Sequence, residues 1–195
     1  MPAPTVSALR ERSRDRVEVE LDGEPWRVVP AVAVVRAGLA VGRPLDRVRA
    51  RQLGRELRRV RALTRAARVL AAGDRSRREL VERLDRAGLP ADAREQALAS
   101  LERAGLVDDE RLARSRADAM ARRGYGDAAI RADLGRRGIA PAVAGEAIEA
   151  LDPEPERARR LLERGGAGPR ELRRLAARGF DRETVRELAG FADET

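Results

Sequence analysis

Three consecutive acidic residues are the side chains of this sequence with the most obvious chemical potential. Asp108, Asp109 and Glu110 could hold a metal ion, or they could cap the N-terminus of a helix and complement its positive end. No further carboxylates lie at ligand spacing around them, and no phosphate-binding loop is present. We therefore predict that Asp108 and Asp109 form a structural cap, and we expect neither a metal nor a cofactor.

The composition narrows the possible functions further. The 195 residues include no Cys and no His, which excludes disulfides, zinc sites of the usual kind, Ser-His-Asp triads and Cys nucleophiles. The acidic residues form no constellation with catalytic spacing, so we predict no catalytic residues and no enzymatic activity. The first 20 residues contain no apolar signal segment, and the longest apolar stretch is too short to span a bilayer, which predicts a cytoplasmic protein without membrane contact.

Arginine is the second chemically distinctive feature. All 41 basic residues are Arg, the formal net charge is +8, and the first 60 residues hold 13 Arg against 8 acidic residues. Residues 46–68 contain nine Arg against only Asp46 and Glu56, and we predict that Arg51, Arg55, Arg58 and Arg59 share one helix face. This face is either a solvated surface in an Arg-biased sequence, or a surface that binds phosphates or an acidic protein.

Further candidate contact residues lie later in the chain. Tyr125, which follows Arg122 and Arg123, either fills a gap between two helices or stacks on a base or a partner side chain. Arg77 and Arg78, Arg136 and Arg137, and the pair at 173–174 are predicted to form a ladder along one face if the helices that carry them stack regularly.

The elements that position these residues change character along the chain. Residues 1–15 are polar and are predicted to be a disordered tail. Alternating apolar residues over 16–30, with a turn at Asp22-Gly23, predict a two-stranded β-hairpin within an N-terminal extension spanning 16–45. Trp26 is expected to pack against a neighbouring helix, which is the more common role of such a residue than base stacking.

From residue 46 onward the pattern is helical and repeats. A Leu stands four residues before a Gly, and an apolar residue follows the Gly, at Gly88, Gly138 and Gly179. Each Gly suits a left-handed helix end, onto which the apolar residue folds back. The predicted fold is mainly α: three tandem three-helix repeats in an elongated curved array, with a small N-terminal β-hairpin. The Arg-rich helix and first repeat span 46–105, the second repeat 106–152 and the third 153–195.

The segment Gly105-Leu106-Val107-Asp108-Asp109-Glu110-Arg111-Leu112-Ala113 resembles the signature of the RecX family of recombination regulators, with Leu112 in place of the usual Phe. The family resemblance continues in Arg122-Arg123-Gly124-Tyr125-Gly126, in Arg178-Gly179-Phe180 and in Arg75-Ser76 before Glu79-Leu80. The Arg-rich helix at 46–68 departs from the family pattern. The curvature of the repeat array is also implied by this resemblance.

The resemblance implies a regulator that binds the RecA recombinase and its nucleoprotein filament, and that inhibits ATPase activity and strand exchange. Contact with the DNA phosphate backbone and a monomeric state are also expected. The alternative is a stand-alone DNA-binding protein with helix-turn-helix-like modules. Base reading is poorly supported, because the chain has no Asn and only Gln52 and Gln96.

Overall fold

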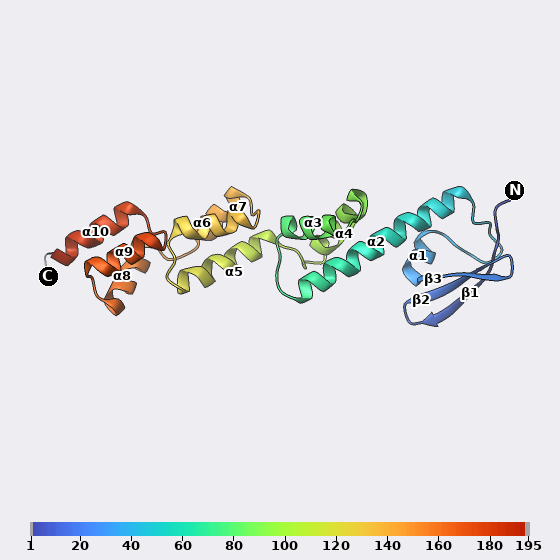
Figure 1. The fold of residues 1–195 in the computed structure, drawn as a ribbon, viewed down its shortest axis with the longest axis horizontal. Coiled ribbons are helices and arrows are strands. Elements are labelled where there is room, and N and C mark those ends of the chain that lie inside the picture. The colour runs from blue at the N-terminus through green and yellow to red at the C-terminus, as the bar shows by residue number, and fades with distance from the viewer. Residues whose placement is uncertain (1, 194–195) are drawn as a thin grey trace. The chain divides into compact units, whose positions relative to one another are not determined.

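The computed structural model describes residues 2–193 and the side chains up to residue 190; Met1 of the predicted tail and residues 194–195 of the third repeat lie outside this part. Three strands precede ten helices in the described chain (Figure 1). The strands are β1 (Val6–Ser13), β2 (Arg16–Leu21) and β3 (Glu24–Pro30). The helices are α1 (Ala31–Arg36), α2 (Arg47–Ala71), α3 (Arg77–Arg86), α4 (Ala91–Arg103), α5 (Asp109–Arg122), α6 (Asp127–Arg136), α7 (Pro141–Glu149), α8 (Glu154–Gly165), α9 (Pro169–Ala177) and α10 (Arg182–Asp193).

The chain divides into two compact units. Unit 1 runs to Gly73 and resumes over Leu80–Leu106, and unit 2 contains Asp74–Glu79 and continues from Val107. Unit 1 therefore holds the sheet, α1, α2, α4 and most of α3, whereas unit 2 holds the first residues of α3 and the helices from α5 to α10. The predicted fold class is confirmed: the chain is mainly helical, with three successive three-helix repeats after a small β region.

The prediction of a disordered tail over residues 1–15 is wrong for residues 6–13, which form β1. The sheet is antiparallel with the order β1-β2-β3, so a third strand joins the predicted hairpin. Val6 is fully buried in the core of unit 1 and Leu9 packs against this core, whereas β1 from Arg10 onward is polar and forms cross-strand ion pairs. Arg10 pairs with Glu20 at 3.1 Å and Arg12 with Glu18 at 2.7 Å. Beyond Leu9, β1 has no apolar residues whose alternation would indicate a strand.

The hairpin turn at Asp22-Gly23 is confirmed, since both residues have positive φ angles of 51° and 90° between β2 and β3. The expectation for Trp26 is wrong, because its side chain is 42% exposed. Val19 pairs with Arg27 and Glu20 pairs with Pro25, so Trp26 is the extra residue of a β-bulge. The bulge takes Trp26 out of the regular alternation that would have directed it to the core.

The helix ends repeat the predicted motif. The N–H groups of Leu89, Ile139 and Phe180 each donate to the carbonyl five residues earlier, at 3.1–3.2 Å. The preceding glycines have φ angles between 69° and 81°, as a left-handed helix end requires. Tyr125 closes α5 in the same way, since its N–H donates to the carbonyl of Met120 at 3.1 Å.

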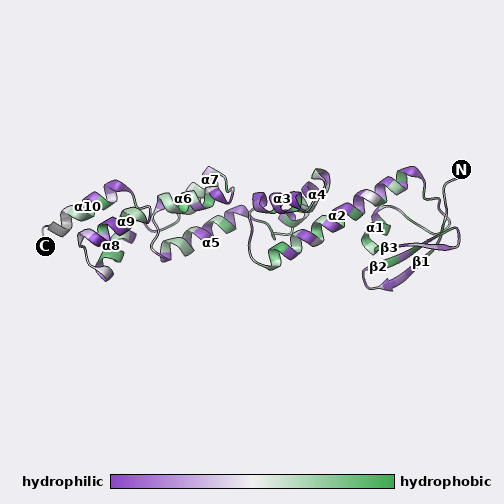
Figure 2. Cartoon of the chain, viewed as in Figure 1, coloured by the Kyte–Doolittle hydropathy of each residue, from purple (hydrophilic) through white to green (hydrophobic). Residues whose placement is uncertain are grey.

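Small side chains form much of the core of the second repeat. Ala113 and Ala117 of α5 are fully buried beside Ile130 and Leu134 of α6. Because Ala takes little room, α5 can lie close to α7 without aromatic residues. Figure 2 shows apolar and polar bands alternating along α2 and α5, whereas α3 is predominantly hydrophilic.

None of the helices within residues 2–193 is long and apolar enough to cross a membrane.

Candidate partner-binding surfaces

Most arginines of α2 lack an acidic partner. Asp46 caps the helix by accepting from the N–H of Arg49 at 2.8 Å, and it also pairs with the Arg49 side chain at 2.6 Å. Six others make no ion pair within the described chain: Arg47, Arg51, Arg58, Arg61, Arg65 and Arg68. A helix with so many uncompensated guanidinium groups is stabilised when an anion lies beside it.

Two of the predicted contact residues on α2 have internal partners. Arg55 donates to the side chain of Gln52 and remains exposed. Arg59 does not share the predicted face: its side chain is 15% exposed, lies 3.5 Å from Glu56 and donates to Ser100 of α4 at 3.1 Å. Arg59 therefore helps to fix α4 on α2, and the exposed cationic face is formed by Arg51, Arg55 and Arg58.

Tyr125 lies in a groove of about 280 Å³ in unit 2. Its ring packs against the core of the second repeat and is half-buried. The guanidinium groups of Arg123 and Arg178 each lie 5.8 Å from the ring centroid, within the range of cation–π interaction. The packing interpretation of Tyr125 is thus supported, and stacking on a base or a partner side chain stays a prediction. Arg123 and Arg136 line the same groove.

The remaining candidates are more strongly paired. Arg122 forms an ion pair with Asp118 one turn earlier, and Arg136 donates to Asp133 at 3.2 Å. Arg137 lies 3.2 Å from Glu79 and 3.4 Å from Asp133. The predicted arginine ladder stays a prediction, although the pairs occupy different positions along their helices. Arg77 and Arg78 begin α3, Arg136 and Arg137 end α6, and the pair at 173–174 lies within α9.

The two motif aspartates cap two different helices. Asp108 is the N-cap of α5, and its Oδ1 accepts from the backbone N–H of Arg111 at 2.9 Å. Asp109 Oδ1 instead accepts from the N–H of Arg77 at 2.8 Å, at the beginning of α3. The sequence motif therefore ties the second repeat to the first repeat's middle helix, which the sequence interpretation did not foresee.

The beginning of α3 is further held by a capping box. Ser76 N–H donates to Glu79 Oε2 at 2.9 Å, and Glu79 N–H donates to Ser76 Oγ at 3.1 Å. Ser76 Oγ also donates to the carbonyl of Arg137, so the end of α6 meets the start of α3. At this contact a Cβ on Gly138 would lie 2.1 Å from Cδ of Arg78, which leaves room only for glycine.

An equivalent joint connects the second and third repeats, and sequence reasoning missed its residues. Glu154, the first residue of α8, accepts from the N–H of Asp127 and, at 2.9 Å, from that of Asp181. Arg157 is 8% exposed, pairs with Asp127 and donates to the carbonyl of Tyr125 at 3.1 Å. The sequence could have indicated Glu154 by its position, because Glu154 is the first residue of α8 as Asp109 is the first residue of α5.

The ion pair of Arg116 and Asp133 gives the second repeat a pH-dependent contribution to stability. Arg116 Nε donates to Asp133 Oδ2 at 2.8 Å, and this hydrogen bond holds the pKa of Asp133 below its ordinary value. Since the folded pKa is lowered, the contribution is present above about pH 4 and is lost as pH falls through the folded value.

We expect Asp133→Asn to lower the free energy of unfolding by about 2 kcal/mol at neutral pH, because Arg116 and Arg136 lose their charged partner and Arg137 loses one of two. Denaturant unfolding of the variant and the wild type across pH 7 to pH 2 measures this difference. It should shrink below about pH 4, and a difference that stays constant would contradict the assigned ion pair.

Comparisons with known proteins agree on one family. Residues 108–148 match the protein family that is described as the second three-helix domain of RecX. The chain is 34% identical over 137 residues to the regulatory protein RecX of Stenotrophomonas maltophilia, covering 65% of this chain and 84% of that protein. It is 40% identical over 138 residues to the regulatory protein RecX of Chromohalobacter salexigens, covering 66% and 91%.

Solved structures show the same fold. A crystal structure of a regulatory protein RecX aligns with a TM-score of 0.80 at 22% identity, covering 96% of this chain and 99% of the other. The structure of RecX from Lactobacillus salivarius aligns with a TM-score of 0.60 at 18% identity, covering 71% and 98%.

Proposed function

Because this chain belongs to the RecX family, we propose that it regulates a RecA recombinase by binding the recombinase and its DNA filament. The observation that carries the binding mode is the exposed face of α2, where Arg51 and Arg58 have no acidic partner in the described chain. A DNA filament coated with recombinase offers phosphates and acidic side chains as complementary anions. The protein acts by binding and not by catalysis.

We further propose that the regulation is inhibition of ATPase activity and strand exchange. Two separate surfaces support this: the α2 face in unit 1 and the Tyr125 groove in unit 2. A ligand held at two places dissociates more slowly than one held at either alone. Slow dissociation would hinder the exchange of recombinase subunits and the entry of a second DNA.

The direct test measures ATP hydrolysis by RecA on single-stranded DNA while the purified protein is titrated from sub-stoichiometric to saturating amounts. We expect hydrolysis to fall before the two proteins reach equal concentrations. A rise in ATP hydrolysis would contradict inhibition but would still agree with regulation of RecA. No change in hydrolysis at saturation would contradict the proposed function as a whole.

Charge reversal of the α2 face tests which residues mediate this effect. We expect the double variant Arg51→Glu, Arg58→Glu to weaken filament binding about 10-fold or more, because two attractive contacts become repulsive. Co-sedimentation or fluorescence anisotropy measures the affinity. The matched control is Arg14→Glu with Arg36→Glu, which changes the charge equally at exposed sites that are not part of α2. Equal losses in both variants would indicate a long-range charge effect and not a specific face.

A second candidate function, stand-alone DNA binding, is favoured by the same unpaired arginines. It predicts tight DNA binding without recombinase, with an affinity that falls steeply with salt and depends on sequence. Binding that is weak or indifferent to sequence without RecA would count against it. The predicted monomeric state and cytoplasmic location stay predictions.

A further inference from the structure

Unit 1 contains a groove of about 650 Å³ between β3 and the stretch of α2 from Leu57 to Arg68. The groove arises because the sheet packs on α2 only near its beginning, where Leu53 is buried in the core and Leu57 is partly buried against it. Trp26, which the bulge in β3 leaves exposed, does not line the groove and so does not fill it. The volume lies within the range of about 300–1,000 Å³ that is typical of ligand sites.

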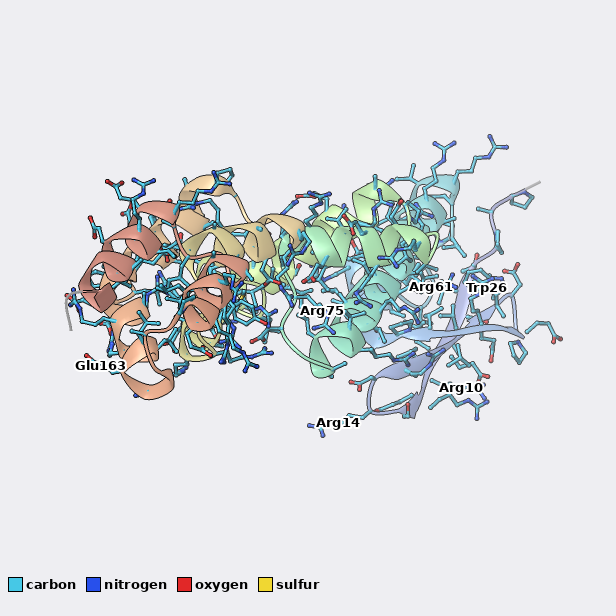
Figure 3. All side chains as sticks on the ribbon, turned by 60° about the vertical axis from the view of Figure 1, so that its left-hand side comes forward. Arg10, Arg14, Trp26, Arg61, Arg75 and Glu163 are labelled. Carbon is cyan, nitrogen blue, oxygen red and sulfur yellow. The ribbon has the colours of Figure 1, made fainter. Side chains whose placement is uncertain are left out.

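The rim of this groove is strongly cationic. Five of its lining residues are arginines and none is acidic: Arg16, Arg27, Arg61, Arg65 and Arg68. The three arginines from α2 make no ion pair within the described chain. Arg16 donates to the carbonyl of Val28 at 3.0 Å, and Arg27 lies 5.2 Å from the ring centroid of Trp26, so the β3 side of the rim is held in place. Figure 3 labels Arg61 and Trp26 in this part of unit 1.

The floor of the groove is apolar. Val29 and Leu89 are buried, and Leu57 and Val60 of α2 are half-buried beside them. An apolar floor of this kind gains free energy by burying aliphatic side chains of a ligand. A surface that binds only phosphates would gain no binding free energy from an apolar floor.

The lining also argues against nucleic acid as the occupant. It contains no aromatic side chain on which a base could stack, and no Asn or Gln that could read a base edge. A strand of DNA would contact the arginines and leave the apolar floor unmatched. The occupant that complements both features carries carboxylates and aliphatic side chains together.

We propose that this groove binds an acidic amphipathic helix of a partner protein. Such a helix places leucine-like side chains on the floor formed by Leu57 and Val60, and its flanking Asp and Glu residues pair with the Arg rim. The planar guanidinium groups of Arg61, Arg65 and Arg68 can each bind a carboxylate through two hydrogen bonds. This site is distinct from the exposed Arg51 and Arg58, which are outside the groove lining.

The test uses the full chain and a labelled synthetic peptide, without recombinase, so that its outcome does not depend on the proposed function. The probe peptide is rich in Glu and carries Leu residues at helical i, i+3, i+4 spacing. A second peptide of identical composition disperses the Leu residues around the helix, and a labelled oligo-dT serves as the nucleic-acid comparison. Fluorescence anisotropy at a series of salt concentrations measures all three.

We expect the patterned peptide to bind at least about 10-fold more tightly than the dispersed peptide, because only the first presents one apolar face. The triple variant Arg61→Glu, Arg65→Glu, Arg68→Glu should lose this binding. The matched variant Arg47→Glu, Arg51→Glu, Arg58→Glu, with the same charge change on the same helix, should retain most of it. Circular dichroism verifies that both variants remain helical.

The floor is tested separately by Val60→Ser, which changes no charge. This variant should weaken binding of the patterned peptide several-fold and leave oligo-dT binding unchanged. Val48→Ser is its control, since Val48 lies on the same helix but is 71% exposed. Equal binding of the two peptides, or oligo-dT binding that is lost in the groove variant and outcompetes the peptide, would overturn the proposal.

Discussion

Replacing Gly126 by Ala is expected to lower the free energy of unfolding of unit 2 by about 3 kcal/mol. Gly126 has an ordinary φ of −83°, so the requirement for glycine is one of space and not of backbone conformation. A Cβ at this position would lie 2.3 Å from the carbonyl oxygen of Gly179 and from the N of Phe180. Both are backbone atoms, which cannot move aside as the end of a flexible side chain can. Urea unfolding followed by circular dichroism measures the loss.

The matched control is Gly135→Ala within α6. A Cβ there would meet nothing within 4 Å, and alanine favours a helix over glycine, so this variant should gain roughly 0.5–1 kcal/mol. The same chemical change nine residues apart thus has opposite expected signs. If Gly126→Ala proves neutral, the α6–α9 contact is not as close as the hydrogen bond from Gly126 N–H to the Arg178 carbonyl, 3.0 Å, indicates.

Replacing Glu154 by Ala is expected to lower the free energy of unfolding by about 3 kcal/mol. One carboxylate, 9% exposed, accepts from the N–H groups of Asp127 and Asp181, and its removal leaves both donors without an acceptor. Thermal and urea unfolding of the full chain measure the change, and Glu154→Gln should lose less, because an amide keeps one acceptor oxygen.

Glu156→Ala controls for the general effect of an acidic residue at a helix start. Glu156 lies in the same first turn of α8 as Glu154 but is exposed, so its removal should change the unfolding free energy by no more than about 0.5 kcal/mol. Similar losses in Glu156→Ala and Glu154→Ala would show that helix polarity, and not the two specific hydrogen bonds, accounts for the effect.

The repeats were predictable because their signals are local. A glycine in a left-handed conformation followed by an apolar residue marks a helix end within six residues, as at Gly138 and Ile139. The turn at Asp22-Gly23 is equally local. The strand β1 was not predictable by the same reasoning, because Arg10 and Arg12 find their partners only across the sheet.

The candidate surfaces were predicted less completely, because exposure depends on neighbours that spacing does not reveal. Helical spacing placed Arg59 with Arg55 and Arg58, whereas the proximity of Ser100 and Glu56 turns it toward α4. In the same way, Arg137 could not be recognised as a partner of Glu79, which lies 58 residues earlier. Buried charges such as Arg157 are the residues that sequence interpretation most easily misplaces on the surface.

The carboxylates that cap helices of a neighbouring repeat also bear on the order in which the repeats unfold. Asp109 of the second repeat completes the start of α3, and Glu154 of the third completes the start of α6. The second repeat therefore provides a capping carboxylate to the first repeat and accepts one from the third. The third repeat only provides a carboxylate to a neighbour. Opening of the third repeat breaks one joint, but opening of the second breaks two. We therefore expect melting of these helices to begin at a terminal repeat and not at the second repeat.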